Sequence, residues 1–317
     1  MTALPAFESL DAVQRWALRA ALEQGSVSTP RGAKTLELIG AGFSLTQPRR
    51  RCIAMPERRW SLPLAIGEFS WHVSGSDELS FIAYYAPRWR EFSSDNAKIE
   101  GSCYGKRVFQ RDVNGGESNW DRLIHLLRMD PESRRAILNF QQSPAEALDP
   151  TSKDVACAST LQFFVRSNAL HALAYMRSND IVLGLPYDVF LFTMLQELLA
   201  QTLNLNLGTY HHFAGSLHLY GRHFDLAERV LASPEPPVFE MPPMGSIDEL
   251  PDFLKAERLL RLGTDADRTR LSPYWQELAA VLAFYRSLRE DTLTSSDLRL
   301  SDSMYGMILR PLIVGRQ

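Results

Sequence analysis

Four short motifs between residues 157 and 220 indicate how this chain folds: Cys157-Ala158-Ser159-Thr160-Leu161-Gln162-Phe163-Phe164-Val165, Arg177-Ser178-Asn179-Asp180, Leu183-Gly184-Leu185-Pro186-Tyr187-Asp188 and His218-Leu219-Tyr220. Around them, residues 159–166 and 170–177 alternate in a way that predicts two strands joined by a turn at 167–169. Residues 187–203 are apolar at helical spacing, which predicts a central buried helix. Residues 207–220 then return as a strand.

The second strand of this hairpin has two distinct faces. Leu170, Ala172, Ala174 and Met176 share one face, and the alternate positions that end with Arg177 share the other. Arg177 therefore leaves the end of a strand beside a loop, which is a usual place for a ligand contact.

The rest of the chain predicts helices and a strand pair, and its composition changes near residue 232. Helices are expected at 9–24, 62–73, 78–85 and 120–127, and a strand pair with glycines at its bend at 35–45. Prolines at 233–237 and 242–243 are typical of a linker, and charged helices follow at 252–262 and 273–289. We predict an α/β (α+β) fold in which a twisted, largely antiparallel or mixed sheet is flanked by helices. Residues 1–240 form the main domain, and 241–317 form a helical extension packed on it.

Composition restricts the class of protein. The chain has 317 residues, 45% hydrophobic and 22% charged, with a net charge of −3, which gives no support for general nucleic-acid binding. Its three cysteines, Cys52, Cys103 and Cys157, form no disulfide framework and suggest a reducing compartment. We recognise no signal peptide, membrane-spanning run or metal-ligand spacing, and we expect a cytoplasmic protein.

Three upstream segments complete a pattern with the four motifs. They are Gly67-Glu68-Phe69-Ser70-Trp71, Tyr104-Gly105-Lys106-Arg107 and Asp130-Pro131-Glu132-Ser133-Arg134-Arg135-Ala136-Ile137-Leu138. In this order, the segments resemble thymidylate synthases across roughly residues 25–232. The glutamate segment is similar to the catalytic-glutamate helix of that family, the second to its Tyr-Gly-Lys turn and the third to its paired-arginine segment.

The resemblance implies a role for each matching residue. Cys157 would add to C6 of a pyrimidine ring, which makes C5 nucleophilic toward the one-carbon unit of 5,10-methylenetetrahydrofolate. Tyr104 would sit near the C5 proton, and Glu68 would organise water for proton transfers. Phosphate would be held by Arg31, Arg177 and, from a partner subunit of a homodimer, Arg134 and Arg135. Ser178 would lie beside the phosphate and sugar, His218 and Tyr220 would bind the sugar, and Trp89, Asp180, Gly184 and Tyr187 would face the folate.

Each of these residues also has a purely structural interpretation. Cys157 can be inert packing, and Arg134-Arg135 a solvated helix edge. Glu68 can be a buried structural acid, and His218 a core histidine. The resemblance assigns nothing to His211 or His212, so we expect both to be structural.

Asp188 is the departure that bears on the substrate. Thymidylate synthases carry at this position an Asn that donates to uracil O4 and accepts the N3 proton. An ionised Asp only accepts, so it would repel O4, whereas the N4 amino group of cytosine is a donor. A proton shared between cytosine N3 and the carboxylate would also support the ring once Cys157 has added. Asp188 therefore predicts a cytidylate substrate, unless it is only a surface N-cap of the helix at 187–203.

Other departures bear on the product. Ser216 replaces the usual Asp, Ala158 the usual His and Met176 the usual Gln, and the closing segment of the family is not recognisable in residues 309–317. Without that segment, water can add to the exocyclic methylene and give a hydroxymethyl group. Trp89 argues for a methyl product if it aligns with the tryptophan that excludes water in the family.

We therefore expect a deoxycytidylate 5-hydroxymethylase that uses dCMP, with CMP as an alternative substrate, and 5,10-methylenetetrahydrofolate without a metal. We also expect a homodimer that shares arginines and binds neither nucleic acid nor membrane. A dCMP methyltransferase, a thymidylate synthase acting on dUMP and a non-catalytic nucleotide-binding protein are the alternatives.

Overall fold

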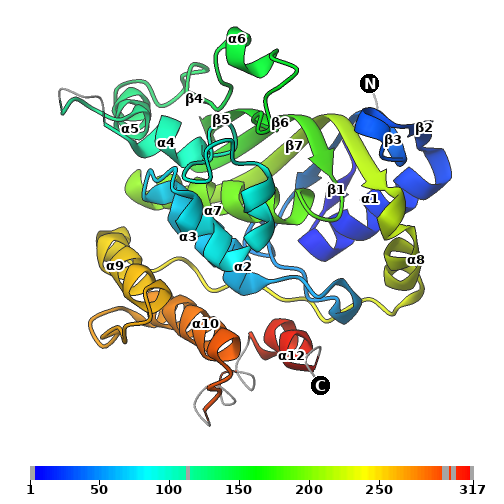
Figure 1. Ribbon diagram of the computed structural model, residues 1–317. Coiled ribbons are helices and arrows are strands. Elements are labelled where there is room, and N and C mark those ends of the chain that lie inside the picture. Colours follow the sequence, from blue (N-terminus) through cyan, green and yellow to red (C-terminus); the bar gives the residue numbers. More distant parts are fainter. Residues whose placement is uncertain (1–3, 112–114, 295–299, 301–304, 315–317) are drawn as a thin grey trace.

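A seven-stranded mixed sheet forms the centre of the computed structural model, which describes residues 4–111, 115–294, 300 and 305–314 (Figure 1). The strand order is β1-β3-β7-β6-β5-β4, and β2 pairs with β3. The β6–β7 and β1–β3 pairs are parallel and the others antiparallel. The strands are β1 (Ala6–Phe7), β2 (Ser26–Ser28), β3 (Thr35–Leu45), β4 (Ile137–Asn139), β5 (Ala158–Arg166), β6 (Ala169–Asp180) and β7 (Asn206–Tyr220).

Helices gather below the sheet in the view of Figure 1. The sheet is contacted by α1, whose N-cap Ser9 accepts from Ala12 N, and by α7, which is largely apolar and mostly buried in the core. The α-helices are α1 (Leu10–Gln24), α2 (Leu62–Val73), α3 (Leu79–Tyr85), α4 (Tyr104–Phe109), α5 (Asn119–Met129), α6 (Pro144–Ala147), α7 (Leu185–Thr202), α8 (Phe224–Ala232), α9 (Leu250–Arg261), α10 (Pro273–Glu290) and α12 (Gly306–Val314). Short 3-10 helices are η1 (Pro30–Gly32), η2 (Pro56–Arg58), η3 (Pro87–Glu91), η4 (Gly221–His223) and η5 (Ile247–Glu249).

The alternation of β6 breaks near its end. Met176 is buried and Arg177 exposed, as the pattern predicts, but the next buried side chain is Asn179 rather than Ser178. In the neighbouring strands, Gly215 of β7 and Gly40 of β3 lie in register with Arg177. Gly40 has a φ of +72°, a backbone conformation that favours glycine. The break turns Asn179 toward the core side, where the candidate site lies.

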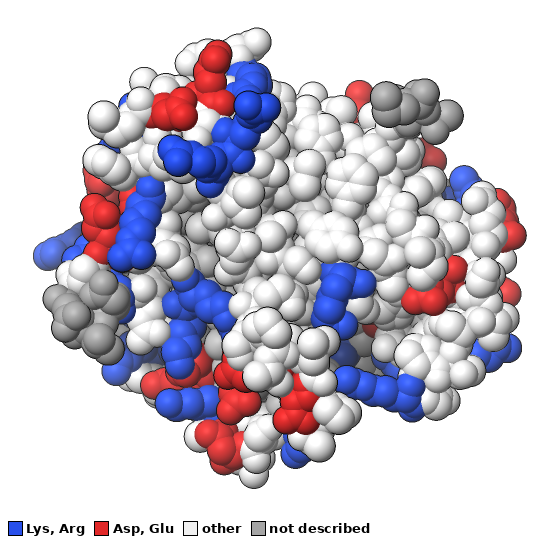
Figure 2. All heavy atoms as spheres, turned by 90° about the horizontal axis from the view of Figure 1, so that it is seen from above, with Lys and Arg blue, Asp and Glu red and all other residues white. Residues whose placement is uncertain are grey.

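The opposite face of the sheet remains open. Tyr175 is 45% exposed, and Phe164, Leu173 and Phe213 on the same side are partly exposed. Figure 2 views this side from above, and its middle carries few charged side chains. The structure therefore presents an apolar sheet face that no helix of the described residues covers.

The C-terminal helices hold α3 from outside. Tyr85 Oη donates to Glu257 Oε1 on α9 at 2.8 Å, and Arg261 on the same helix donates to Glu257 at 2.8 Å. On α10, Tyr285 Oη donates to the carbonyl of Tyr85 at 3.1 Å. The ring of Tyr85 fills the space beside Gly67, so α9 and α10 support the helix that carries Glu68.

A buried ion pair joins the C-terminal extension to the core. Arg51 and Glu197 are both buried and form a short charged hydrogen bond, and the other Glu197 oxygen accepts from Met244 N at 3.0 Å. A buried carboxylate needs hydrogen-bond partners, so the backbone N–H of Met244 helps to stabilise the charge of Glu197 on α7.

The structure confirms the predicted fold class, a mixed sheet flanked by helices. The strand pair predicted at 35–45 is wrong, because Gly40 bends a single strand without reversing it. The segment that begins at Tyr104 is the first turn of α4, not an isolated turn. The short strand β4 was not predicted from the sequence. No helix of the described residues has the length and apolarity to cross a membrane.

Candidate active site

Cys157 lies directly before β5, and Arg177 holds the loop that carries it. Arg177 Nε donates to the carbonyl of Ala156 and Nη2 to that of Val155, each at 2.9 Å. The same Nη2 lies 3.8 Å from Cys157 Sγ. The backbone of β5 is also fixed behind the thiol, since Ala158 N donates to Tyr104 Oη at 3.2 Å.

The Cys157 thiol is not activated in this single chain. Burial raises its pKa to about 11, although the positive charge of Arg177 acts in the opposite direction. Desolvation therefore outweighs the effect of Arg177 on this thiol.

Tyr104 is fixed by His72 of α2. The two rings stack with centroids 5.2 Å apart and an interplanar angle of 4°, and His72 Nδ1 accepts from Gly105 N at 3.1 Å. Burial lowers the pKa of His72 to about 3, so this histidine is neutral and can accept at Nδ1. Burial also raises the pKa of Tyr104 well above its usual value, which keeps the phenol protonated.

Glu68 and Asp188 are two acids from different helices that share one environment. Burial raises the pKa of Glu68 to about 8, and the negative charge of Asp188 adds to the shift. Burial raises the pKa of Asp188 to about 7, opposed by a hydrogen bond from Asn179. Both groups can exchange protons near neutral pH, which is a property of acid–base sites.

Asp188 is not the surface N-cap of α7. That cap is Gly184, and Asp188 lies one turn into the helix, largely withdrawn from solvent. Asp188 Oδ2 accepts from Asn179 Nδ2 at 2.7 Å. A Cβ on Gly184 would lie 3.1 Å from Asn179 Nδ2 and 3.3 Å from Asp188 Oδ2, so the glycine leaves room for this contact.

Sequence reasoning missed three residues behind Asp188. Asn179 Oδ1 lies 3.0 Å from His212 Nε2, and His212 Nδ1 lies 2.8 Å from Tyr210 Oη. All three side chains are buried. Their signal in the sequence was weak, because Asn179 stands between two residues with assigned roles and His212 alternates with Tyr210 on an ordinary strand.

The residues expected on the folate side lie around the start of α7. Asp180 Oδ1 accepts from Val182 N at 2.8 Å and Leu183 N at 3.2 Å. Tyr187 stacks on Trp60 at 5.7 Å and accepts from Ser61 N at 3.2 Å. Trp89, in η3, packs on Trp71 of α2 at 5.7 Å. The neighbouring Arg58, which the sequence did not single out, is buried near Tyr187 and Asp180 and donates to the carbonyl of Val182.

His218 and Tyr220 lie at the end of β7, and their rings meet edge to face at 5.1 Å. Ser216 Oγ donates to Glu37 and lies 3.4 Å from His218 Nδ1. Glu37 pairs with His218 across the sheet, so it supplies a carboxylate beside Ser216, the position where the resemblance expects Asp. Ser178 pairs with Ser216 across the sheet. The Arg222 guanidinium covers the Tyr220 ring at 4.1 Å.

Three of the expected phosphate ligands stand apart from Cys157 within one chain. Arg31 is exposed in η1, with a φ of +52°. Arg134 and Arg135 are exposed just before β4, and their side chains form no hydrogen bond or ion pair with other described residues. The paired arginines lie in a loop, so the interpretation as a helix edge is wrong.

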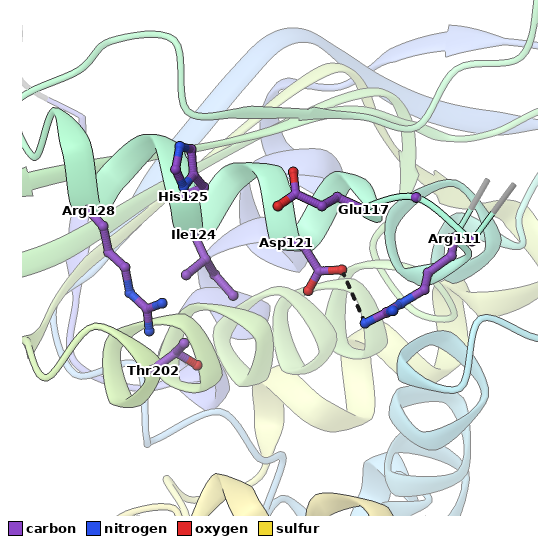
Figure 3. Close-up of a pocket in the computed structure, with 9 residues that line it drawn as sticks. Arg111, Glu117, Asp121, Ile124, His125, Arg128 and Thr202 are labelled. Atoms are coloured by element: carbon purple, nitrogen blue, oxygen red, sulfur yellow. Dashed lines mark ion pairs between the residues drawn. The ribbon is translucent and has the colours of Figure 1, made fainter.

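A separate hollow of about 520 Å³ lies along α5 and contains none of the predicted site residues (Figure 3). Arg111 and Asp121 form an ion pair of 3.9 Å at its rim. Among the described residues, no group of three or more His, Cys, Asp or Glu side chains is arranged to hold a metal ion.

Similarity to known proteins identifies a family for most of the chain. A family model described as "Thymidylate synthase" matches residues 16–253. A thymidylate synthase from Bacillus mojavensis is 30% identical over 227 residues, which cover 70% of this chain and 78% of that protein. One from Francisella philomiragia subsp. philomiragia is 28% identical over 184 residues, which cover 54% of this chain and 66% of that protein.

Proposed function

Because the chain belongs to the thymidylate synthase family, we propose that it is a cytidylate 5-hydroxymethyltransferase. The family consists of folate-dependent enzymes that transfer a one-carbon unit to C5 of a pyrimidine nucleotide. In our proposal the nucleotide is dCMP, with CMP as a weaker alternative. Water adds to the transferred carbon, and the products are 5-hydroxymethyl-dCMP and tetrahydrofolate.

The observation that carries the proposal is Asp188. Asp188, on α7, is partly buried beside Glu68 of α2 and has a pKa near 7, and it stands where the resemblance expects the Asn that reads the base. A protonated carboxyl offers one donor and one acceptor, and cytosine offers the matching N3 acceptor and N4 donor. An ionised carboxyl would place its negative charge against uracil O4, which is also an acceptor. A protonated carboxyl whose proton points to N3 would meet the N3–H of uracil, so both protonation states disfavour dUMP.

In this proposal Cys157 Sγ forms a bond to C6 of the ring and loses its proton. Since its pKa is about 11 in the isolated chain, addition depends on stabilising the thiolate as it forms. Arg177, with Nη2 at 3.8 Å from that sulfur, supplies the positive charge beside it. Tyr104 stays a neutral phenol near C5, and Glu68, with a pKa near 8, handles protons through water.

The folate donor, 5,10-methylenetetrahydrofolate, supplies the one-carbon unit when it is bound. Trp89 and Tyr187 offer aromatic faces to it, and Asp180 keeps one oxygen, Oδ2, outside its turn hydrogen bonds. Gly184 provides a close backbone approach, because no Cβ fills that space. The reaction needs no metal in this proposal.

A second copy of the chain completes the phosphate site. The apolar face marked by Tyr175 and its neighbours pairs with the same face of the partner, as isologous interfaces do. The partner subunit's Arg134 and Arg135 then reach the nucleotide, together with Arg31 and Arg177 of the first chain. This arrangement accounts for two exposed arginines without any partner among the described residues of their own chain.

Two observations favour a second candidate function, methyl transfer. Both relatives named above are called thymidylate synthases, and Trp89 packs on Trp71 close to the Glu68 helix, where it can exclude water. A dCMP methyltransferase would keep the Asp188 preference, whereas a dUMP-using synthase would not. A non-catalytic nucleotide-binding protein is a third reading, which the conjunction of Cys157, Glu68, Tyr104 and Arg177 argues against.

The test is to incubate the protein with 5,10-methylenetetrahydrofolate and dCMP, CMP or dUMP separately, and to weigh the products by mass spectrometry. We expect a gain of CH2O on dCMP, and no product from the Cys157→Ala protein. A gain of CH2 on dCMP would establish the methyltransferase instead. Turnover of dUMP alone would overturn the cytidylate assignment, and binding without turnover in every lane would favour the non-catalytic reading.

A further inference from the structure

A row of four polar side chains, three of them buried, runs from β7 to the partly buried Asp188 on α7. The atoms in order are Tyr210 Oη, His212 Nδ1 and Nε2, Asn179 Oδ1 and Nδ2, and Asp188 Oδ2, with contacts of 2.8, 3.0 and 2.7 Å. Phe43 stacks on the His212 ring at 5.0 Å and 15°, which fixes the plane of the imidazole. Buried polar groups in such a row must be matched donor to acceptor.

The direction of the row follows from its first member. Tyr210 is fully buried, and within the described residues its hydroxyl has one hydrogen-bond partner, His212 Nδ1. Burial lowers the pKa of His212 to about 3, so the ring is neutral and has a single N–H. If Nδ1 carried that hydrogen, the tyrosine O–H would be left buried without an acceptor, which is the costly arrangement.

Each following contact is then determined. Tyr210 donates to Nδ1, so His212 carries its hydrogen on Nε2 and donates to Asn179 Oδ1. The amide of Asn179 therefore presents its NH2 to Asp188 Oδ2, which accepts. The other carboxyl oxygen, Oδ1, forms no hydrogen bond with a described residue, and Asp188 keeps partial exposure.

We propose that Tyr210, His212 and Asn179 form a specificity-determining relay that keeps Asp188 Oδ2 as an acceptor and reserves Oδ1 for the proton. This inference rests on the proposed function and deepens it. The free Oδ1–H donates to N3 of cytosine, and the second lone pair of Oδ2 accepts from N4. The relay residues position Asp188 and do not touch the substrate themselves.

The same relay penalises uracil. Uracil presents O4 as an acceptor and N3–H as a donor, so it requires the proton on Oδ2 and a lone pair on Oδ1. Moving the proton to Oδ2 makes that oxygen a poorer acceptor for the Asn179 N–H, and reversing the amide forces the histidine tautomer to change. The reversal ends at Tyr210, whose buried hydroxyl would lose its acceptor.

Other ionisable groups also face Asp188 and must stay constant in any test. They come from α2, α4, the loop before β5, the end of β6 and β7, and are Glu68, Tyr104, Cys157, Asp180 and Tyr210. Removing only the hydroxyl of Tyr210 alters none of the carboxyl groups.

The experiment measures dissociation constants for dCMP and dUMP by titration calorimetry in the Cys157→Ala protein, which cannot form the covalent bond. Tyr210→Phe, made in that protein, frees His212 to adopt the other tautomer. We expect the preference for dCMP over dUMP to fall about tenfold or more, since one buried hydrogen bond is at stake. Asn179→Ala is the second variant, and it should also shift the pH midpoint of dCMP binding upward, because the hydrogen bond that lowers the Asp188 pKa is gone.

Tyr274→Phe is the matched control. Tyr274 is also a buried tyrosine, and its hydroxyl donates to Met194 Sδ, away from the relay. That variant should keep the preference of the parent protein, and thermal unfolding checks that every variant is folded.

The outcomes separate the two claims. If the parent protein prefers dCMP and both relay variants retain that preference, the relay is wrong while the proposed function stands. If the parent prefers dUMP or binds neither nucleotide, the proposed function fails and the relay inference fails with it.

Discussion

Arg177 Nη2 lies 3.8 Å from Cys157 Sγ while its guanidinium is anchored on the carbonyls of Val155 and Ala156. The arginine thus supports the loop before β5 and also places its positive charge next to the thiol. Its two backbone contacts prevent it from following a ligand freely, which suits a site that must be arranged before the nucleotide arrives.

Replacing Arg177 by Ala should slow alkylation of Cys157. Burial has raised the pKa of the Cys157 thiol to about 11, and Arg177 lowers it. Loss of Arg177 therefore raises this pKa further, and each added pKa unit leaves roughly tenfold less thiolate. The rate of iodoacetamide labelling at Cys157, followed by peptide mass, measures the effect. Arg166→Ala, on the distant hairpin end, is the control, and equal rates in all three proteins would exclude an electrostatic role for Arg177.

Asp188→Asn should weaken the pH dependence of stability. Burial raises the folded-state pKa of Asp188 to about 7, above the ordinary value of 3.8, so its contribution to stability is full at low pH and is lost as pH rises between these values. Asn has no charge to bury. Between about pH 5 and about pH 8, the wild type should lose on the order of 2 kcal/mol more unfolding free energy than the variant. Urea unfolding at both pH values measures this difference, and parallel curves would contradict the assigned pKa.

Removing the carboxylate of Glu257 should loosen α3 and, through it, the Glu68 helix. Glu257→Ala leaves the buried Tyr85 hydroxyl and the Arg261 guanidinium without their shared acceptor, at a cost of about 1–3 kcal/mol. Urea unfolding gives the stability change, and turnover at saturating substrate reports the effect on Glu68. Lys255→Ala, an exposed change on the same helix, should leave both quantities alone.

Gly105→Ala should disturb Tyr104 more than its size suggests. The added Cβ would lie 1.9 Å from the backbone oxygen of His72, and backbone cannot move aside as a flexible side chain can. We expect a loss of about 1–3 kcal/mol in unfolding free energy. Gly221→Ala, where the nearest atom is at 3.4 Å, is the control, and a neutral Gly105→Ala would show that α4 and α2 are less tightly apposed than described.

Mixing two inactive proteins should restore part of the activity. Arg135→Ala removes a phosphate ligand that we assign to the partner's site, and Cys157→Ala removes the nucleophile from the other. A mixed dimer has one site with both groups intact, whereas no site in either parent dimer has both. Assays before and after mixing measure the recovery. If the two proteins stay inactive together although native mass spectrometry shows mixed dimers, the arginine does not cross the interface.

Much of the architecture could be predicted because its signals are local. The hairpin around residues 167–169, the apolar helix at 185–202 and the charged C-terminal helices each carry their own periodicity. The bend of β3 at Gly40 could not be predicted, because glycine occurs in a sequence both where a strand bends at positive φ and where the chain reverses. The three-residue strand β4 is too short to show a period.

The candidate site divides in the same way. Cys157, Glu68, Tyr104 and Asp188 stand in motifs, and the structure gathers them from four separate elements. The relay behind Asp188 was not predictable, because a break in the alternation of β6 turns Asn179 inward. In our proposal the roles of Arg134 and Arg135 depend on a second chain, and within one protomer both are exposed side chains.

The contact between Glu197 and Met244 has a consequence for how this protein can be divided. The part that resembles its relatives ends near residue 253 and includes Met244, whose N–H stabilises the buried Glu197 carboxylate together with Arg51. A chain cut at residue 240, the predicted domain boundary, would keep every motif of the candidate site. It would still lose the Met244 donor to this carboxylate, along with the helices that contact Tyr85. A minimal enzyme must therefore extend beyond the last motif, to residues that contribute only packing and hydrogen bonds.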